Sequence, residues 1–328
     1  MATHNGFMQP VSRTWSRPRY RFLVLLIFAL SLYVIVPQVS LVWQSISLVR
    51  NLRPSDMVCA IVSLALTFPL AANSYHFLAR RRLIYHRTIL IALANMFTNR
   101  LLPAGAGSIA TFFVYLRKRK HTVNQATSVV AVNNFLGIIS HGCLLAGLLV
   151  FDRHGFKGLS LPIVDSKVVV FGLVSVAIAA CLAIGQTARR QRIGAFVRSL
   201  SRDVLFYWRF PLRLTAASVS STLLTIANAL SLYFCVLAVN GRIGLLAALA
   251  VFTFGIVVGT LTPTPGGLGG TEAGLLAGLI GYHVPSQTAL AVVVLYRLIT
   301  YWLTLALGAA SYVYVEKRGY LHRFEPVD

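Results

Sequence analysis

The chain carries uncharged apolar runs that are long enough to cross a lipid bilayer. A membrane-spanning helix needs about 20 apolar residues, because the hydrocarbon core is about 30 Å thick. Such runs recur along the 328 residues, for example at residues 22–36, 57–79, 168–186 and 214–239. Because 57% of the residues are hydrophobic and only helices and closed barrels satisfy their backbone in lipid, we predict an all-α polytopic membrane protein.

One apolar segment, residues 243–282, is interrupted by a proline- and glycine-rich run at residues 261–273. Prolines remove backbone donors and glycines permit unusual conformations, so one helix cannot run through it. We expect Thr271 to cap a new helix and Glu272 to take its first position, where a carboxylate suits the helix dipole. A plain turn between two membrane helices is the alternative. The turn residues are Pro263, Pro265, Gly266, Gly267, Gly269 and Gly270.

A second broken segment covers residues 88–116 and is interrupted at residues 99–108, which include Pro103, Gly105 and Gly107. At about 1.5 Å per residue, each arm of 13 or 14 residues would be about 20 Å long, which is short of the hydrocarbon core. The segment is therefore predicted to enter the membrane, turn and return as a re-entrant helical hairpin.

Positive charge is concentrated in a few loops and in the tails. A net charge of +22 would suggest nucleic acid as the partner of a soluble chain, but in a membrane protein it marks the cytoplasmic side. If both broken segments are hairpins, 22 Lys and Arg residues share one side and six share the other. The 22 lie in the two tails and in residues 80–87, 117–120 and 189–213. We therefore expect cytoplasmic termini and no nucleic-acid partner.

The layout predicts an inverted repeat. Half one, residues 22–151, and half two, residues 168–315, each read span, span, broken hairpin, span. Three crossings per half invert the second half, as in many secondary transporters. The prediction is one transmembrane domain, residues 22–315, with six full spans and two hairpins (eight crossings if the hairpins are counted). Residues 1–21 and 316–328 are the predicted cytoplasmic tails.

Six polar residues belong to the two hairpins and the last span, where we predict a substrate-binding site. They are Asn99, Arg100, Ser108, Thr271, Glu272 and Arg297. Two helix starts, at Ser108 and Thr271, would offer backbone N–H groups that suit phosphate. Arg297 lies deep in the last span, where a charge is costly unless it is paired. Its partner is either a ligand phosphate or Glu272, and Arg100 either joins the site or snorkels to the membrane interface.

The sequence contains no arrangement typical of an enzyme or of a cofactor site. No serine or cysteine has an identifiable His/Asp arrangement, the histidines form no metal-like cluster, and there is no P-loop or dinucleotide fingerprint. We therefore expect no catalytic residue, no metal and no cofactor.

Three segments resemble the membrane region of the lysylphosphatidylglycerol synthase/flippase family. They are residues 265–273, residues 99–107, and Tyr296-Arg297 with the following Tyr301-Trp302. The resemblance implies a lipid-translocating module, here as a stand-alone member without the aminoacyltransferase domain that often accompanies it. Lipid aminoacylation is therefore not expected.

The chain also departs from the pattern of that family. Ser108 and residues 109–111 stand where the family often has a Glu and then an Arg, and Asn133-Asn134 replace an acidic–basic pair. The substrate therefore need not be an aminoacyl phospholipid.

Taken together, the residues and the resemblance favour a flippase-like transporter of a phosphate-bearing phospholipid or glycolipid. The expected partner is a membrane lipid with an anionic head group, and the expected location is the bacterial cytoplasmic (inner) membrane. An ion-coupled small-solute transporter is one alternative. Another is a non-transporting partner of a lipid-modifying or glycosyl-transfer enzyme. Homo-oligomers and partner enzymes both remain open.

Overall fold

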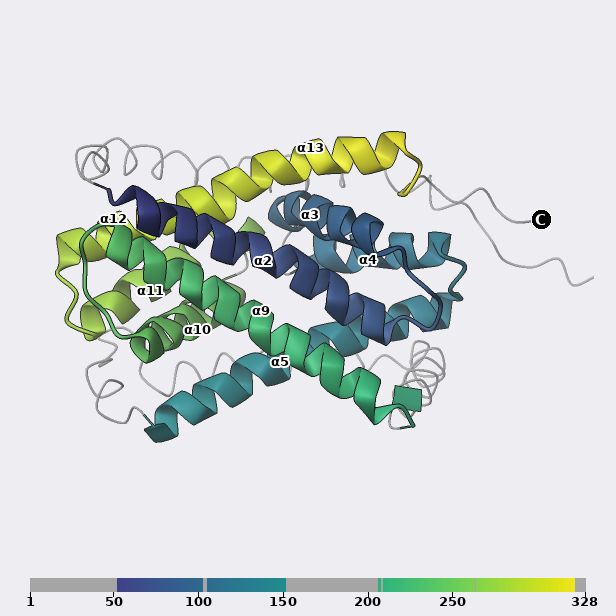
Figure 1. Cartoon of the computed structure of the whole chain (residues 1–328), viewed down its shortest axis with the longest axis horizontal. Coiled ribbons are helices and arrows are strands. Elements are labelled where there is room, and N and C mark those ends of the chain that lie inside the picture. The colour runs from purple at the N-terminus through teal and green to yellow at the C-terminus, as the bar shows by residue number, and fades with distance from the viewer. Residues whose placement is uncertain (1–51, 103–104, 152–205, 208, 263, 322–328) are drawn as a thin grey trace, which may run out of the picture. The chain divides into compact units, whose positions relative to one another are not determined.

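A computed structural model describes residues 52–102, 105–151, 206–207, 209–262 and 264–321 (Figure 1). Contacts divide the chain into residues 1–44 and residues 45–328, and every described residue belongs to the second unit. The predicted spans at residues 22–36 and 168–186 lie outside the described residues, as do the N-terminal tail and the end of the C-terminal tail.

Within the described part, four helices are long and apolar enough to cross a membrane. Three are continuous: α2 (Pro54–Leu78), α5 (Val123–Phe151) and α9 (Pro211–Ala238). The fourth is made of α12 (Ser286–Arg297), the π-helical segment η4 (Leu298–Leu303) and α13 (Thr304–Lys317). Proline at the start of α2 and α9 suits a first helical turn, whose N–H groups lack intrahelical partners anyway. The prediction of an all-α polytopic membrane protein is confirmed.

Both broken segments form pairs of shorter helices. The first pair is α3 (Tyr85–Leu101) and α4 (Ala106–Lys118). The second is α10 (Leu245–Leu261) and α11 (Gly270–Gly281), joined through the 3₁₀ turn η3 (Pro265–Gly267). Gly105, Gly266 and Gly269 have φ angles of 73°, 64° and 84°, a region that glycine enters without steric cost. The two arms of 17 residues, α3 and α10, are each about 25 Å long, still short of a roughly 30 Å core.

The first hairpin returns to the side from which it enters. Arg119, which follows α4, donates from Nη2 to the carbonyl of Arg82 before α3, at 3.4 Å. Lys118 donates from Nζ to the carbonyl of Gly319, just beyond α13, at 2.7 Å. The basic loops on either side of this hairpin therefore lie at one end of the helices, together with the end of the last span, as the charge distribution predicts.

The described elements repeat in the predicted order, and corresponding elements make corresponding contacts. Helices α2 and α9 form the most extensive helix–helix contact and lie side by side in Figure 1. Each packs on the following hairpin, α2 on α3 and α9 on α10, and each hairpin packs on the next span, α4 on α5 and α11 on α12. Buried apolar residues form two clusters, and each includes residues of one hairpin together with residues of the long spans around it. The packing of the described helices therefore follows the predicted order of elements in the two halves.

Candidate functional site

The start of α11 differs from the sequence prediction. Gly269 is the N-cap residue and Gly270 opens the helix, so Glu272 is its third residue and Thr271 is not the cap. Here Glu272 reaches back and accepts the Gly269 backbone N–H on Oε2 at 2.7 Å, as an acidic residue in a capping box does. Glycine opens the helix because any Cβ at position 270 would overlap the hydroxyl of Thr262, the residue that follows α10. Tertiary packing therefore sets where the helix begins.

Thr271 packs toward the other arm of its hairpin. It is buried, and its hydroxyl lies where a Cβ on Gly259 of α10 would be. The glycine at position 259 thus allows α10 and α11 to approach closely near the turn that joins them. This close approach places Glu272 within reach of Arg297.

Arg297 and Glu272 form an ion pair, which is one of the two alternatives left open for this arginine. The Arg297 Nε atom donates to Glu272 Oε1 at 2.6 Å. The arginine side chain is 7% exposed and the carboxylate 19%. The pair uses only one part of the guanidinium, because the Nη2 atom of Arg297 is buried and has no hydrogen-bond partner. A buried donor without a partner is costly, so this atom is suited to a ligand acceptor.

Arg100 reaches inward from the last turn of α3 and does not snorkel. Its Nη2 atom donates to the carbonyl of Thr300 at 2.9 Å, and its Nε atom is buried without a partner. The carbonyl belongs to η4, and π-helical segments are frequent at functional sites. Arg100 therefore connects the first hairpin to the last span, 200 residues further along the chain.

The two arginines share one aromatic ring. The guanidinium carbon of Arg100 lies 4.8 Å from the centroid of Tyr301, and that of Arg297 lies 5.2 Å from it. A Cβ on Gly266, in the turn of the second hairpin, would lie 2.8 Å from the Tyr301 ring and 3.0 Å from Arg100 Cδ. Both hairpins and the last span therefore meet at Tyr301. Among the described residues, a single carboxylate, Glu272, accompanies the two positive charges.

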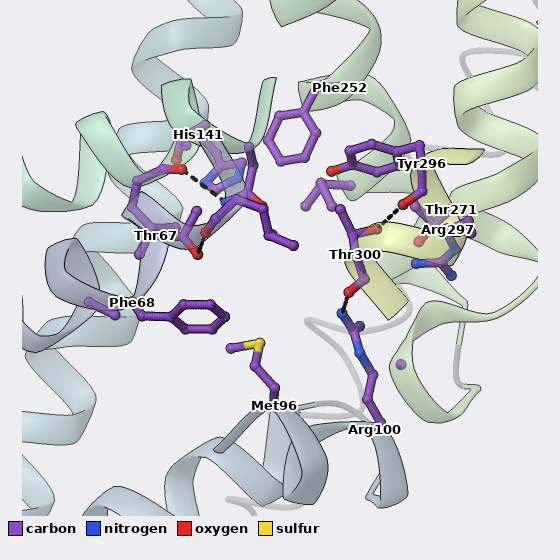
Figure 2. Close-up of a pocket in the computed structure, with 17 residues that line it drawn as sticks. Thr67, Phe68, Met96, Arg100, His141, Phe252, Thr271, Tyr296, Arg297 and Thr300 are labelled. Carbon is purple, nitrogen blue, oxygen red and sulfur yellow. Dashed lines mark hydrogen bonds between the residues drawn. The ribbon is translucent and has the colours of Figure 1, made fainter. Parts of the chain in front are cut away.

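A partly open cavity of about 280 Å³ lies between the two halves of the fold. Its polar lining includes Thr67, Arg100, His141, Asn228, Thr271 and Arg297. Figure 2 shows Arg100 reaching Thr300, with Arg297 and Thr271 nearby and the apolar side chains of Phe68 and Met96 also facing the space. The arrangement suits a small anionic group flanked by apolar parts.

Three predicted site residues, Ser108, Asn99 and Glu272, are not among the residues that line this cavity, although Glu272 is paired with Arg297, which does line it. Ser108 is the third residue of α4, after an N-cap at Gly105, and its hydroxyl accepts from Asn95 Nδ2 at 3.1 Å. Asn99 is not among the lining residues, and its Oδ1 atom is buried without a partner. Ser108 takes the position in α4 that Glu272 takes in α11, so the half-one counterpart of the charged group is neutral.

The turn residues are placed as follows. Pro103 and Pro263 lie outside the described residues. Gly107 packs so closely on α3 that any Cβ would overlap the Thr98 carbonyl. Pro265 opens η3, and Gly267 has a φ angle of 66°. The predicted turn positions that are described thus lie where the chain reverses or where helices come into close contact.

Sequence reasoning did not assign a role to Tyr301 or to the Thr300 carbonyl. Tyr301 belongs to one of the segments that carry the family resemblance, which was the available signal. Nothing in the sequence indicates a π-helical segment at Leu298–Leu303, and a backbone carbonyl has no residue signature.

These features define an all-α polytopic membrane protein in which two broken-helix hairpins and the last span meet beside a partly open cavity lined by two arginines. The chain belongs to the lysylphosphatidylglycerol synthase TM region family, whose family model matches residues 21–308. It is also similar to a UPF0104 membrane protein from Pyrococcus horikoshii, with 35% identity over 96 residues. That match covers 29% of each of the two chains.

Proposed function

We propose that this protein moves a lipid with a phosphate-bearing head group between the two leaflets of the membrane. The observation that carries the proposal is the pair of guanidinium groups on Tyr301, those of the buried Arg297 and the half-buried Arg100, which line a cavity between the hairpins. Among the described residues, a single carboxylate, Glu272, accompanies them. An excess of buried positive charge is costly, and a phosphate relieves it. Membership in a family named for a lipid synthase supports a lipid as the ligand.

The head group would enter the cavity while the acyl chains stay in the bilayer. Its phosphate would accept hydrogen bonds from Arg297 Nη2 and from Arg100, which have unpartnered N–H groups. The first backbone N–H groups of α11 would add donors, since helix starts favour anions. The cavity of about 280 Å³ is suited to a head group alone, so the apolar chains would remain in lipid.

We further propose that the end carrying the basic loops faces the cytoplasm, where positive residues accumulate. The protein would act in the cytoplasmic membrane, without catalysing a chemical change in the lipid. Movement would follow the lipid gradient or be coupled to an ion.

The proposal is tested with purified protein in liposomes that contain acyl-labelled phosphatidylglycerol, by the rate at which label in the inner leaflet becomes accessible outside. We expect wild-type protein to accelerate this rate and Arg297→Lys to lose most of the acceleration, because an ammonium group lacks the planar fork of a guanidinium. Arg242→Gln is the matched control, because Arg242 is exposed and lies outside the cavity. Folded wild-type protein that moves no lipid, or Arg297→Lys at the wild-type rate, would contradict the proposal.

A further inference from the structure

We infer, building on the proposed lipid transport, that the head group carried through this cavity is a phosphodiester with a single negative charge and no amine. The family name mentions a lysyl lipid, which bears an amine, so the inference separates this chain's substrate from the one in that name. Two features of the cavity support this inference: the net charge of the side chains around it, and the hydrogen-bond donors there that have no partner.

Among the described residues, the charged side chains at the site are Arg100, Arg297 and Glu272, which together carry a net charge of +1. The remaining described acidic residues, Asp56 and Glu316, lie in the first turn of α2 and near the end of α13. The other polar side chains in the lining are hydroxyl groups, the Asn228 amide and the His141 imidazole, and none of them is a carboxylate. The hairpins contribute two helix N-termini and two C-termini, whose partial charges of about half a unit each roughly cancel.

The site has donors to offer but no carboxylate for an amine. Arg297 Nη2 and Arg100 Nε are buried without partners. Both oxygens of Glu272 are engaged, one by Arg297 Nε and the other by the Gly269 N–H. Within the described residues, an ammonium group in this cavity would therefore meet two guanidinium groups and no available carboxylate. Like charges at such short range repel strongly in a medium of low dielectric constant.

Charge balance then ranks the head groups. A phosphodiester such as that of phosphatidylglycerol brings one negative charge and neutralises the site. A zwitterionic head group such as phosphatidylethanolamine leaves the site at +1 and adds an unpartnered amine. A phosphomonoester carries about −1.5 to −2 at pH 7, so phosphatidic acid over-neutralises the site. The glycerol and ethanolamine head groups are similar in size, so these two lipids differ mainly in charge.

The test compares transport of acyl-labelled phosphatidylglycerol, phosphatidylethanolamine and phosphatidic acid by the wild-type protein in liposomes of one composition at pH 7.5. We expect phosphatidylglycerol to move at least about tenfold faster than either other lipid, because a site with matched polar groups rejects a substrate that leaves them unpaired. Equal rates for phosphatidylglycerol and phosphatidylethanolamine would overturn the inference and leave lipid transport standing. No acceleration of any lipid over protein-free liposomes would overturn both.

A second part of the test changes the charge of the site by substitution. Glu272→Gln raises the net charge to +2, so the rate for phosphatidic acid relative to phosphatidylglycerol should rise at least about fivefold. Arg100→Gln lowers the net charge of the site to zero, so the preference for phosphatidylglycerol over phosphatidylethanolamine should fall by a similar factor. This variant tests the inference independently if Glu272→Gln does not fold. Arg242→Gln should leave both ratios unchanged. Folded charge variants with wild-type ratios would overturn the inference.

Discussion

The Glu272–Arg297 pair can be measured by a double-mutant cycle made of Glu272→Gln, Arg297→Gln and the double variant. The two groups are 2.6 Å apart and mostly buried, so each single change leaves a charge without its partner. Glutamine at position 272 keeps an oxygen that can still accept the Gly269 N–H. The cycle therefore tests the ion pair with little disturbance of the helix cap.

The expected size follows from the burial of the two groups. Removing one member of a buried ion pair costs about 3–5 kcal/mol, because the remaining charge stays in a medium of low dielectric constant. Because Glu272 retains some exposure, we expect the lower end, about 3 kcal/mol, for each single variant. The double variant leaves neither member of the pair without its partner and should cost no more than either single one. The interaction energy would then be about 3 kcal/mol, the upper end for residues in contact.

The assay is reversible unfolding in mixed detergent micelles, with thermal unfolding as a second readout. Single effects that add to within about 0.5 kcal/mol would refute the ion-pair reasoning. Glu272→Gln combined with Arg242→Gln is the control and should be additive. Lipid transport separates stability from function: the double variant should be no less stable than either single variant but should be inactive, since it lacks the Arg297 donor. A folded double variant that moves lipid at the normal rate would rule out the role of Arg297 at the phosphate.

Three further predictions concern topology, packing and pH. Single cysteines at Arg82 and Lys118 should both resist an impermeant thiol reagent in intact cells; labelling of one alone contradicts the hairpin. Gly259→Ala should lower stability by about 1–3 kcal/mol through overpacking, whereas Gly142→Ala, which has open space, should not; equal melting temperatures contradict this. Burial lowers the pKa of His121 below its usual 6.5, so stability should fall as pH drops below about 6.5, where only the unfolded chain readily gains the proton. Melting at pH 7.5 and 5.5 checks this, and His121→Gln should respond less.

The positions of the breaks were predictable because proline and glycine act locally. A proline lacks its N–H wherever it stands, and the glycines at 105, 266 and 269 adopt positive φ angles that other residues avoid. The start of α11 was predicted less well. Thr271 is a good N-cap by composition, yet the N-cap is Gly269 and the helix begins two residues earlier than predicted, since close packing on Thr262 favours glycine at 270.

What the sequence by itself determined was therefore the class of protein, the long spans within the described residues and the two broken segments. It also singled out Arg100, Glu272 and Arg297, which the structure brings close to one another; their role in substrate binding stays a prediction. Each of these predictions depends on local composition or on the cost of charge in lipid. Only the tertiary structure decided that Arg100 meets the Thr300 carbonyl and shares Tyr301 with Arg297. It also decided that Ser108 and Asn99 lie outside the cavity. The physical reason is that these contacts join distant parts of the chain, so they depend on how the two halves pack.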